Sequence, residues 1–190
     1  CSSDLATLLN KYQFDASKDF TPITLLASTP LVLLTNTQTG IQSAKQLIAY
    51  AKEHPNVLNY ASGGNGGLTH IAMEMFASKA GIQLTHIPYK GSGPAVIDLL
   101  AGRVQLAYST PPAVLQHIKS GRIKALMVSG AKRSAAFPDV PCSAELGLPD
   151  YTVSTWYGVW APKGTPADAQ ARAVEEIRRA GLTDAAKAVW

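Results

Sequence analysis

Short apolar runs rich in β-branched residues alternate with amphipathic runs along most of this chain. The alternation recurs about every 20 to 25 residues, which is the combined length of one strand and one helix. We expect strands at 23–28, 31–36, 57–61, 82–88, 104–109, 123–129 and 153–161. We expect helices at 43–53, 68–80, 94–100, 111–120 and 166–180, and a single helical turn at 143–146. This order of elements is typical of an α/β fold.

The alternation predicts a parallel-rich sheet flanked by helices. Pro30 separates the first two apolar runs, so they are expected to form two strands rather than one central strand. The stretch 130–152 breaks the period and is expected to be a long surface connection. Because parallel strands end at the same edge of a sheet, the loops that follow them should meet along one rim. Ligands of open α/β sheets bind at that rim.

Composition and charge narrow the class of protein. The 190 residues are 46% hydrophobic and 16% charged, which is enough for one domain or one and a half. The net charge is +4, but the densest basic stretch, from Lys119 to Arg133, is expected to be a solvated face rather than a nucleic-acid site. No apolar run approaches the ~18 residues of a membrane helix, and no leader pattern follows Cys1. These features indicate either a cytoplasmic protein or a missing beginning.

The strongest local signal is the segment from Ser62 to Gly67, where four glycines join a predicted strand to a predicted helix. Exposed backbone N–H groups and the positive end of the helix dipole favour an anion at such a joint. The loop lacks G-K-[ST], and the third glycine of G-x-G-x-x-G would fall at Thr69, so neither nucleotide motif is present. The expected ligand is a small carboxylate or phosphate. The alternative is a glycine turn required only for close packing.

Polar side chains around this loop extend the candidate site. Ser62 and Thr69 offer hydroxyl groups and Asn65 an amide, each able to contact a ligand oxygen or to cap the turn or the helix. His70 and Glu74 share one face of the predicted helix, but no third ligand is identifiable, so no metal is expected. The chain contains no G-x-S-x-G motif, and we predict no catalytic nucleophile.

The residues at these loops resemble those of the Bug or TctC family, the extracytoplasmic solute-binding receptors of bacterial tripartite tricarboxylate transporters. The most specific segments are Leu-Asn-Tyr-Ala-Ser-Gly-Gly-Asn-Gly at 58–66, followed by Thr69 and His70, and Ile-Pro-Tyr-Lys-Gly-Ser at 87–92. Further matching segments lie at 19–24, 99–102, 133–134, 138–141, 145–147, 156–158, 161–162 and 164–166. Their order and spacing run almost without gaps from Leu5 to Ala169.

The resemblance implies a type II periplasmic-binding-protein fold, of which the chain carries one nearly complete lobe and pieces of the other. The expected boundaries are 1–21 for a remnant of lobe 1, 22–36 for the first crossover strands, 37–153 for lobe 2, and 154–190 for the return crossover strand and a partial lobe 1 helix. The resemblance also implies a periplasmic receptor, monomeric when intact, that captures a small carboxylate for membrane transporter subunits. No catalysis, cofactor, metal or nucleic acid is expected.

In the family, one ligand carboxylate is held by the loop that matches residues 62–67, whereas the glycine-rich loop that completes the site has no match in this chain. Gly67 stands where the family usually has a small hydroxyl residue, which removes one possible donor. The identity of the carboxylate stays open. The alternatives are a small α/β enzyme acting on an anionic substrate at the same rim, or a ligand-sensing effector domain. The candidate ligand-binding residues are Ser62, Gly63, Gly64, Asn65, Gly66, Gly67, Thr69, His70, Tyr89 and Ser109.

Overall fold

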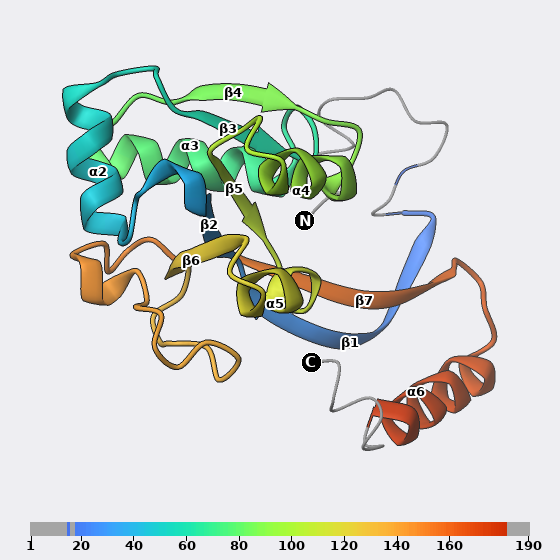
Figure 1. Cartoon of the computed structure of the whole chain (residues 1–190). Coiled ribbons are helices and arrows are strands. Elements are labelled where there is room, and N and C mark those ends of the chain that lie inside the picture. The colour runs from blue at the N-terminus through green and yellow to red at the C-terminus, as the bar shows by residue number, and fades with distance from the viewer. Residues whose placement is uncertain (1–14, 16–17, 182–190) are drawn as a thin grey trace. The chain divides into compact units, whose positions relative to one another are not determined.

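A computed structural model describes residue 15 and residues 18–181. The chain divides into two compact units, one formed by residues 30–154 and the other by residues 1–29 together with 155–190 (Figure 1). Most of the predicted lobe 1 remnant at 1–21, Cys1, and the tail at 182–190 lie outside the described residues. The boundaries between the units fall at the end of one strand, β1 (Phe20–Pro30), and at the start of another, β7 (Ser154–Pro162).

Unit 30–154 is built on a five-stranded sheet with the strand order β4-β3-β5-β2-β6. Its strands are β2 (Val32–Asn36), β3 (Asn59–Ser62), β4 (Thr85–Pro88), β5 (Leu106–Ser109) and β6 (Ile123–Val128). β3 pairs in parallel with β4 and β5, whereas β2 is antiparallel to both β5 and β6. Four strands therefore share one direction and β2 opposes them. The α/β class with a parallel-rich sheet is confirmed, and β2 makes the sheet mixed.

Helices cover both faces of this sheet. Side chains of α2 (Ala44–Glu53) and α3 (Leu68–Ala80) pack with Leu33 and Tyr60 on one face. Side chains of α4 (Ser92–Leu100) and α5 (Pro111–Lys119) pack with Leu34 and Ala61 on the other (Figure 1). Successive strand residues alternate between these two cores, as the pleat requires. A register shift in the pairing of β2 with β6 interrupts that alternation and leaves Leu126 and Met127 in the same core.

Local signals fix the ends of the helices. Ser43 caps α2 by accepting a hydrogen bond from the Gln46 N–H at 3.2 Å, as the predicted capping box requires, while the Gln46 side chain accepts from the N–H of Gln42 rather than from that of Ser43. α3 ends at Gly81, which adopts the left-handed conformation at φ 63°. α4 begins two residues before the predicted start at Pro94.

The segment 130–152 is packed more deeply than a surface connection would be, so that expectation was wrong for its anchoring residues. Tyr151 is 0% exposed, and its hydroxyl lies 2.8 Å from the Ala72 carbonyl oxygen and 2.9 Å from the Tyr108 hydroxyl. Ser143 donates to the Tyr151 carbonyl at 2.6 Å. The predicted helical turn is present as η2 (Ala144–Leu146). Tertiary contacts, rather than local periodicity, order this segment.

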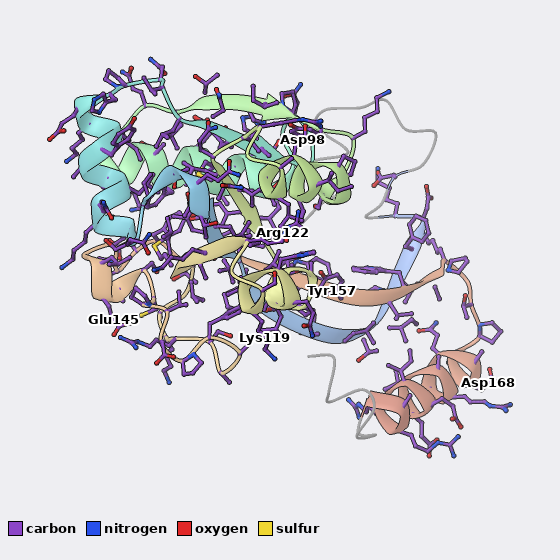
Figure 2. The ribbon with its side chains drawn as sticks, viewed as in Figure 1. Asp98, Lys119, Arg122, Glu145, Tyr157 and Asp168 are labelled. Atoms are coloured by element: carbon purple, nitrogen blue, oxygen red, sulfur yellow. The ribbon has the colours of Figure 1, made fainter. Side chains whose placement is uncertain are left out.

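An ion pair links two exposed side chains of this segment. Arg133 binds Glu145, labelled in Figure 2, at 2.9 Å. Hydrogen bonds from Arg133, together with one from the Cys142 backbone N–H, lower the pKa of Glu145 to about 2. The pair therefore stays ionised across the ordinary pH range.

The second unit contains a two-stranded sheet of β1 and β7 and the helix α6 (Ala167–Gly181). The Lys163 N–H donates to the Asp19 carbonyl at 2.8 Å, which joins the beginning of β1 to the end of β7. Trp156 and Trp160 lie on the same face of β7, with ring centroids 5.1 Å apart. Gly158 stands between these two indoles.

A methyl group at position 158 has no room. A Cβ atom there would lie 2.9 Å from Cη2 of Trp160 and 3.2 Å from Cζ3 of Trp156. We therefore expect Gly158→Ala to push the indoles apart, shift the tryptophan fluorescence and cost about 1–3 kcal/mol of stability. Gly93→Ala is the matched control, because nothing lies within 4 Å of its Cβ position and the residue is in α4. Equal melting temperatures and spectra for both variants would contradict this packing.

Candidate functional site

The glycine loop between β3 and α3 leaves the start of the helix open. Gly67 occupies the N-cap position, with extended backbone and no side-chain cap hydrogen bond. The first intrahelical hydrogen bond runs from the Ile71 N–H to the Gly67 carbonyl at 3.0 Å. The N–H groups of Leu68, Thr69 and His70 therefore precede the hydrogen-bonded part of the helix and point out of its positive end. This geometry suits an anion.

The loop itself is held by its own glycine N–H groups. Gly63 donates to Thr69 Oγ1 at 3.0 Å, and Gly66 donates to His70 Nδ1 at 3.0 Å. Gly64 donates to Ser62 Oγ at 3.2 Å, and Gly67 to the Gly64 carbonyl oxygen at 3.2 Å. The glycines thus serve first to shape the loop. Thr69 Oγ1 accepts from Gly63, so its hydroxyl hydrogen remains able to donate to a ligand oxygen.

The loop after β4 lies directly against the glycine loop, as the parallel strands predict. The N–H of Tyr89 donates to the Ser62 carbonyl and that of Gly91 to the Gly63 carbonyl, each at 3.0 Å. At Gly64, φ is 142° and a Cβ atom would lie 3.5 Å from the Tyr89 carbonyl oxygen. Glycine is required there by the backbone conformation.

Three other predicted site residues take different places. The Tyr89 hydroxyl donates to Asp98 of α4 at 2.8 Å, and Asp98 also pairs with Arg103, so this side chain is bound to α4 (Asp98 is labelled in Figure 2). Burial, followed by the Asp98 hydrogen bond, raises the pKa of Tyr89. Ser109 is buried at the end of β5, on the same rim. Asn65 is exposed at the tip of the loop.

Two stacked histidines lie against the glycine loop and contact its residues. The rings of His70 on α3 and His86 on β4 are 3.9 Å apart and within 8° of parallel. His86 Nε2 lies 2.6 Å from Ser62 Oγ, and the Tyr60 ring stacks near both histidines, with its centroid 4.8 Å from that of His86 and 6.3 Å from that of His70. Tyr60 in turn donates a short hydrogen bond to Glu74. Burial, then the neighbouring His70, lowers the pKa of His86.

His86, Tyr60 and the hydrogen-bond partner of Glu74 were not predicted from the sequence. In the parallel register Tyr60 is opposite His86, so the two rings meet only because β3 and β4 are neighbours. His70 and Glu74 share a face of α3, but the Glu74 carboxylate accepts its hydrogen bond from the Tyr60 hydroxyl. The signal that identifies this cluster is strand pairing, which the sequence alone does not specify.

The contact between Ser62 and His86 is partly buried beneath the glycine loop. Ser62 is 1% exposed, and its hydroxyl is also tied to both the N–H and the carbonyl of Gly64. In this position the serine connects β3, the loop and β4. Among residues 15 and 18–181, no group of three His, Cys, Asp or Glu side chains is placed to hold a metal ion.

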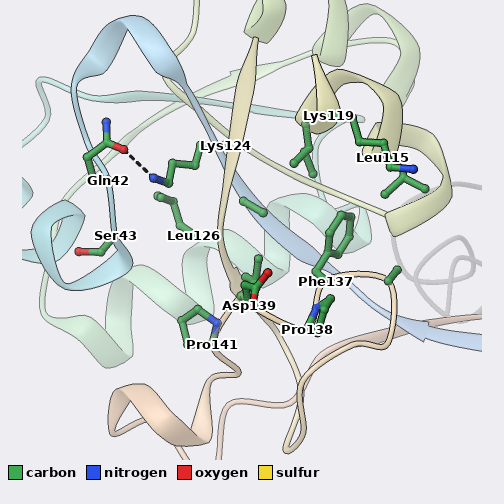
Figure 3. Close-up of a pocket in the computed structure, with 14 residues that line it drawn as sticks. Gln42, Ser43, Leu115, Lys119, Lys124, Leu126, Phe137, Pro138, Asp139 and Pro141 are labelled. Carbon is green, nitrogen blue, oxygen red and sulfur yellow. Dashed lines mark hydrogen bonds between the residues drawn. The ribbon is translucent and has the colours of Figure 1, made fainter. Parts of the chain in front are cut away.

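A separate hollow of about 540 Å³ lies at the β6 edge of unit 30–154 (Figure 3). Its walls come from α5, β6, the start of α2 and residues 136–141. Lys124 Nζ donates to Gln42 Oε1 at 2.6 Å at one end, whereas Phe137 and Leu115 supply apolar wall (Figure 3). None of the predicted site residues lines this hollow. Within the described part of the chain, no helix has the length and apolarity to cross a membrane.

Residues 4–186 match the family model for TctC, the tripartite tricarboxylate transporter family receptor. The chain belongs to the TctC family. Protein BugT of Bordetella pertussis is 41% identical over 159 residues, which are 84% of this chain and 49% of BugT. A UPF0065 protein from the tcbD-tcbE intergenic region of Pseudomonas sp. strain P51 is 40% identical over 168 residues, 88% of this chain and 50% of that protein.

Solved structures agree with this assignment. An R. palustris protein with adipate superposes with a TM-score of 0.87 at 32% identity, covering 93% of this TctC-family chain and 59% of that protein. MatC from Rhodopseudomonas palustris, with bound malate, gives 0.84 at 29% identity, covering 96% and 62%. The periplasmic-binding-protein fold expected from the sequence is confirmed. The TctC-family chain spans about half the length of the curated relatives that it matches.

Proposed function

We propose that the protein to which this chain belongs is a periplasmic receptor that captures a small carboxylate for a tripartite transporter and performs no catalysis. The observation that carries the proposal is the open N-terminus of α3, which lies at the carboxyl edge of parallel strands. Membership of the TctC family and the carboxylates named for two structural neighbours support it. The membrane subunits of the transporter are the proposed partners, and the receptor is proposed to act as a monomer.

The proposed carboxylate site uses the first turn of α3. One ligand carboxylate accepts from the N–H groups of Thr69 and His70 and from the Thr69 hydroxyl, while the exposed Asn65 amide closes over it. Each such hydrogen bond to a carboxylate is charge-assisted and therefore stronger than a neutral one. Gly63, Gly64, Gly66 and Gly67 are proposed to keep this approach free of side chains.

Tyr89 and Ser109 are proposed to act at the rim, Tyr89 through its backbone beside the loop. We propose that unit 30–154 corresponds to lobe 2, predicted at 37–153, and that β1 and β7 are the crossover strands. The remaining contacts with the ligand are proposed to come from the other lobe.

A panel of carboxylates tests the proposed function. Because a ligand that binds only the native state stabilises it, malate or adipate should raise the melting temperature, by an amount equivalent to about 2.7 kcal/mol at a hundred times Kd. The uncharged diamides of the same acids are the matched controls and should leave the melting temperature unchanged. Equal responses to acid and diamide, or none to any acid in the panel, would contradict a carboxylate receptor.

A further inference from the structure

We propose that His70 and His86 are positioning residues for the glycine loop, which the neutral histidine pair holds closed and a single protonation of the pair releases. This proposal rests on the proposed function and extends it to the regulation of the same site by pH. It assigns both rings a role that requires no direct contact with the ligand.

The first step is the hydrogen bond at Gly66. A backbone N–H can only donate, so His70 Nδ1, 3.0 Å away, must present a lone pair. The ring is therefore neutral in this arrangement, with its proton on Nε2. When His70 gains a proton, Nδ1 becomes a donor that faces the donor of Gly66. The hydrogen bond is then lost and the loop loses its contact with α3.

The second step is the stack of the two rings. Two imidazolium ions stacked at 3.9 Å repel each other, so the pair does not readily carry two charges. His86 also fixes Ser62, whose hydroxyl binds Gly64, so both halves of the loop depend on this ring pair. A protonated His86 can still donate from Nε2 to Ser62 Oγ, so its charge acts through the stacked rings, whereas protonation of His70 removes the Gly66 hydrogen bond directly.

The surrounding groups set the direction of the pH dependence. Tyr60 and Ser62 face the pair from β3, and Glu74 from α3. The carboxylate of Glu74 favours a protonated His86, but it is engaged by Tyr60, and burial and His70 outweigh it and lower the pKa of His86. A histidine with a lowered folded pKa contributes stability that is present above its unfolded value, about 6.5, and lost as the pH falls. Acid therefore opens the loop.

An attractive force acts in the opposite sense, because an imidazolium draws an anion toward the loop. Glu74 interacts electrostatically with His86 and partly neutralises a charge there, whereas protonation of His70 removes its hydrogen bond with Gly66. We expect the loss of the Gly66 hydrogen bond to outweigh the attraction between the imidazolium and the anion. Carboxylate affinity should therefore fall about fivefold between pH 7.5 and pH 5.5, the equivalent of one hydrogen bond.

Nuclear magnetic resonance tests the proposal without any ligand. Imidazole nitrogen shifts at pH 7.5 should report His70 with its proton on Nε2. The exchange protection of the Gly66 amide should fall about fivefold on going to pH 5.5. The amide of Gly81, which closes the other end of α3, is the control and should keep its protection. A proton on Nδ1 of His70 at pH 7.5, or unchanged protection of Gly66, would overturn the proposal.

Variants of His70 separate the effect of its hydrogen bond with Gly66 from the effect of its charge. His70→Asn places a non-titrating carbonyl oxygen near the position of Nδ1, so it should keep Gly66 protected at both pH values. His70→Ala should leave Gly66 unprotected at both, and His54→Asn, at an exposed position, should behave as the wild type. If His70→Asn keeps the wild-type pH dependence, the proposal fails.

A binding measurement with adipate then completes the test. Calorimetry on the wild type and His70→Asn at both pH values corrects for protonation of adipate itself, since that contribution is common to both proteins. The wild type should lose about fivefold more affinity than the variant, and equal losses would contradict the proposal. If adipate and the other acids fail to bind at any pH, the proposed function fails, while the amide measurements still decide the role of the histidines.

Discussion

Replacing Gly66 by Asp is expected to abolish the rise in melting temperature that a small dicarboxylate produces, while Gly121→Asp leaves that rise intact. Both glycines have left-handed backbone, with φ 70° and φ 72°, which Asp tolerates better than most residues. The two variants therefore carry the same added charge and similar strain. They differ in position, because Gly66 is in the glycine loop and Gly121 is in the turn after α5.

The expected size of this effect follows from the repulsion between charges. Two carboxylates about 5 Å apart near a protein surface repel by roughly 3 kcal/mol, which is about a hundredfold in affinity. Differential scanning fluorimetry with adipate and malate measures the response, and circular dichroism checks that both variants are folded. A normal response from Gly66→Asp would place the carboxylate elsewhere. A lost response from Gly121→Asp would show that the loss is not specific to the loop.

Truncation of Tyr151 is expected to cause the largest loss of stability in unit 30–154. Its ring is fully buried, and its hydroxyl joins the Ala72 carbonyl on α3 to Tyr108 on β5. Tyr151→Ala should cost about 3–5 kcal/mol through the cavity that it leaves. Tyr151→Phe keeps the ring and should cost about 1–2 kcal/mol, because two buried polar groups lose a partner.

Urea denaturation measures both variants against Tyr50→Ala, a control at a tyrosine that is 37% exposed on α2. That control should cost less than about 1 kcal/mol. If Tyr151→Ala were no more destabilising than the control, the segment 130–152 would not be anchored by this ring. If Tyr151→Phe were as damaging as Tyr151→Ala, the hydroxyl network would outweigh the packing.

Local signals explain why parts of the fold were predictable from the sequence. α3 has the predicted bounds because a glycine loop precedes it and the left-handed Gly81 ends it. The direction of β2 was not predictable, because all five of its residues are buried and a strand buried on both faces shows the same apolar run in either direction. The burial of Tyr151 depends on α3 and β5, which are remote in sequence.

The candidate site, like the fold, was only partly predictable from the sequence. The approach of the loops after β3 and β4 follows from parallel strands, and the sequence placed both loops on one rim. The fixed orientation of His70 and the contact of His86 with Ser62 depend on which strands are neighbours and on side-chain direction. Periodicity carries no information about either. The sequence alone therefore indicates which class of ligand such a loop suits, whereas the residues that support the loop are identified only from the structure.

The antiparallel strand β2 also constrains the order in which the chain can fold. It is the first strand of the five along the sequence, yet both of its neighbours, β5 and β6, follow it by about seventy or more residues. During synthesis from the N-terminus, the apolar segment Val32–Asn36 has no pairing partner until residues near 106–128 have been made. Such non-local pairing slows folding and leaves apolar surface open to association in the meantime. A nascent chain of this kind gains most from a chaperone that shields its first strand.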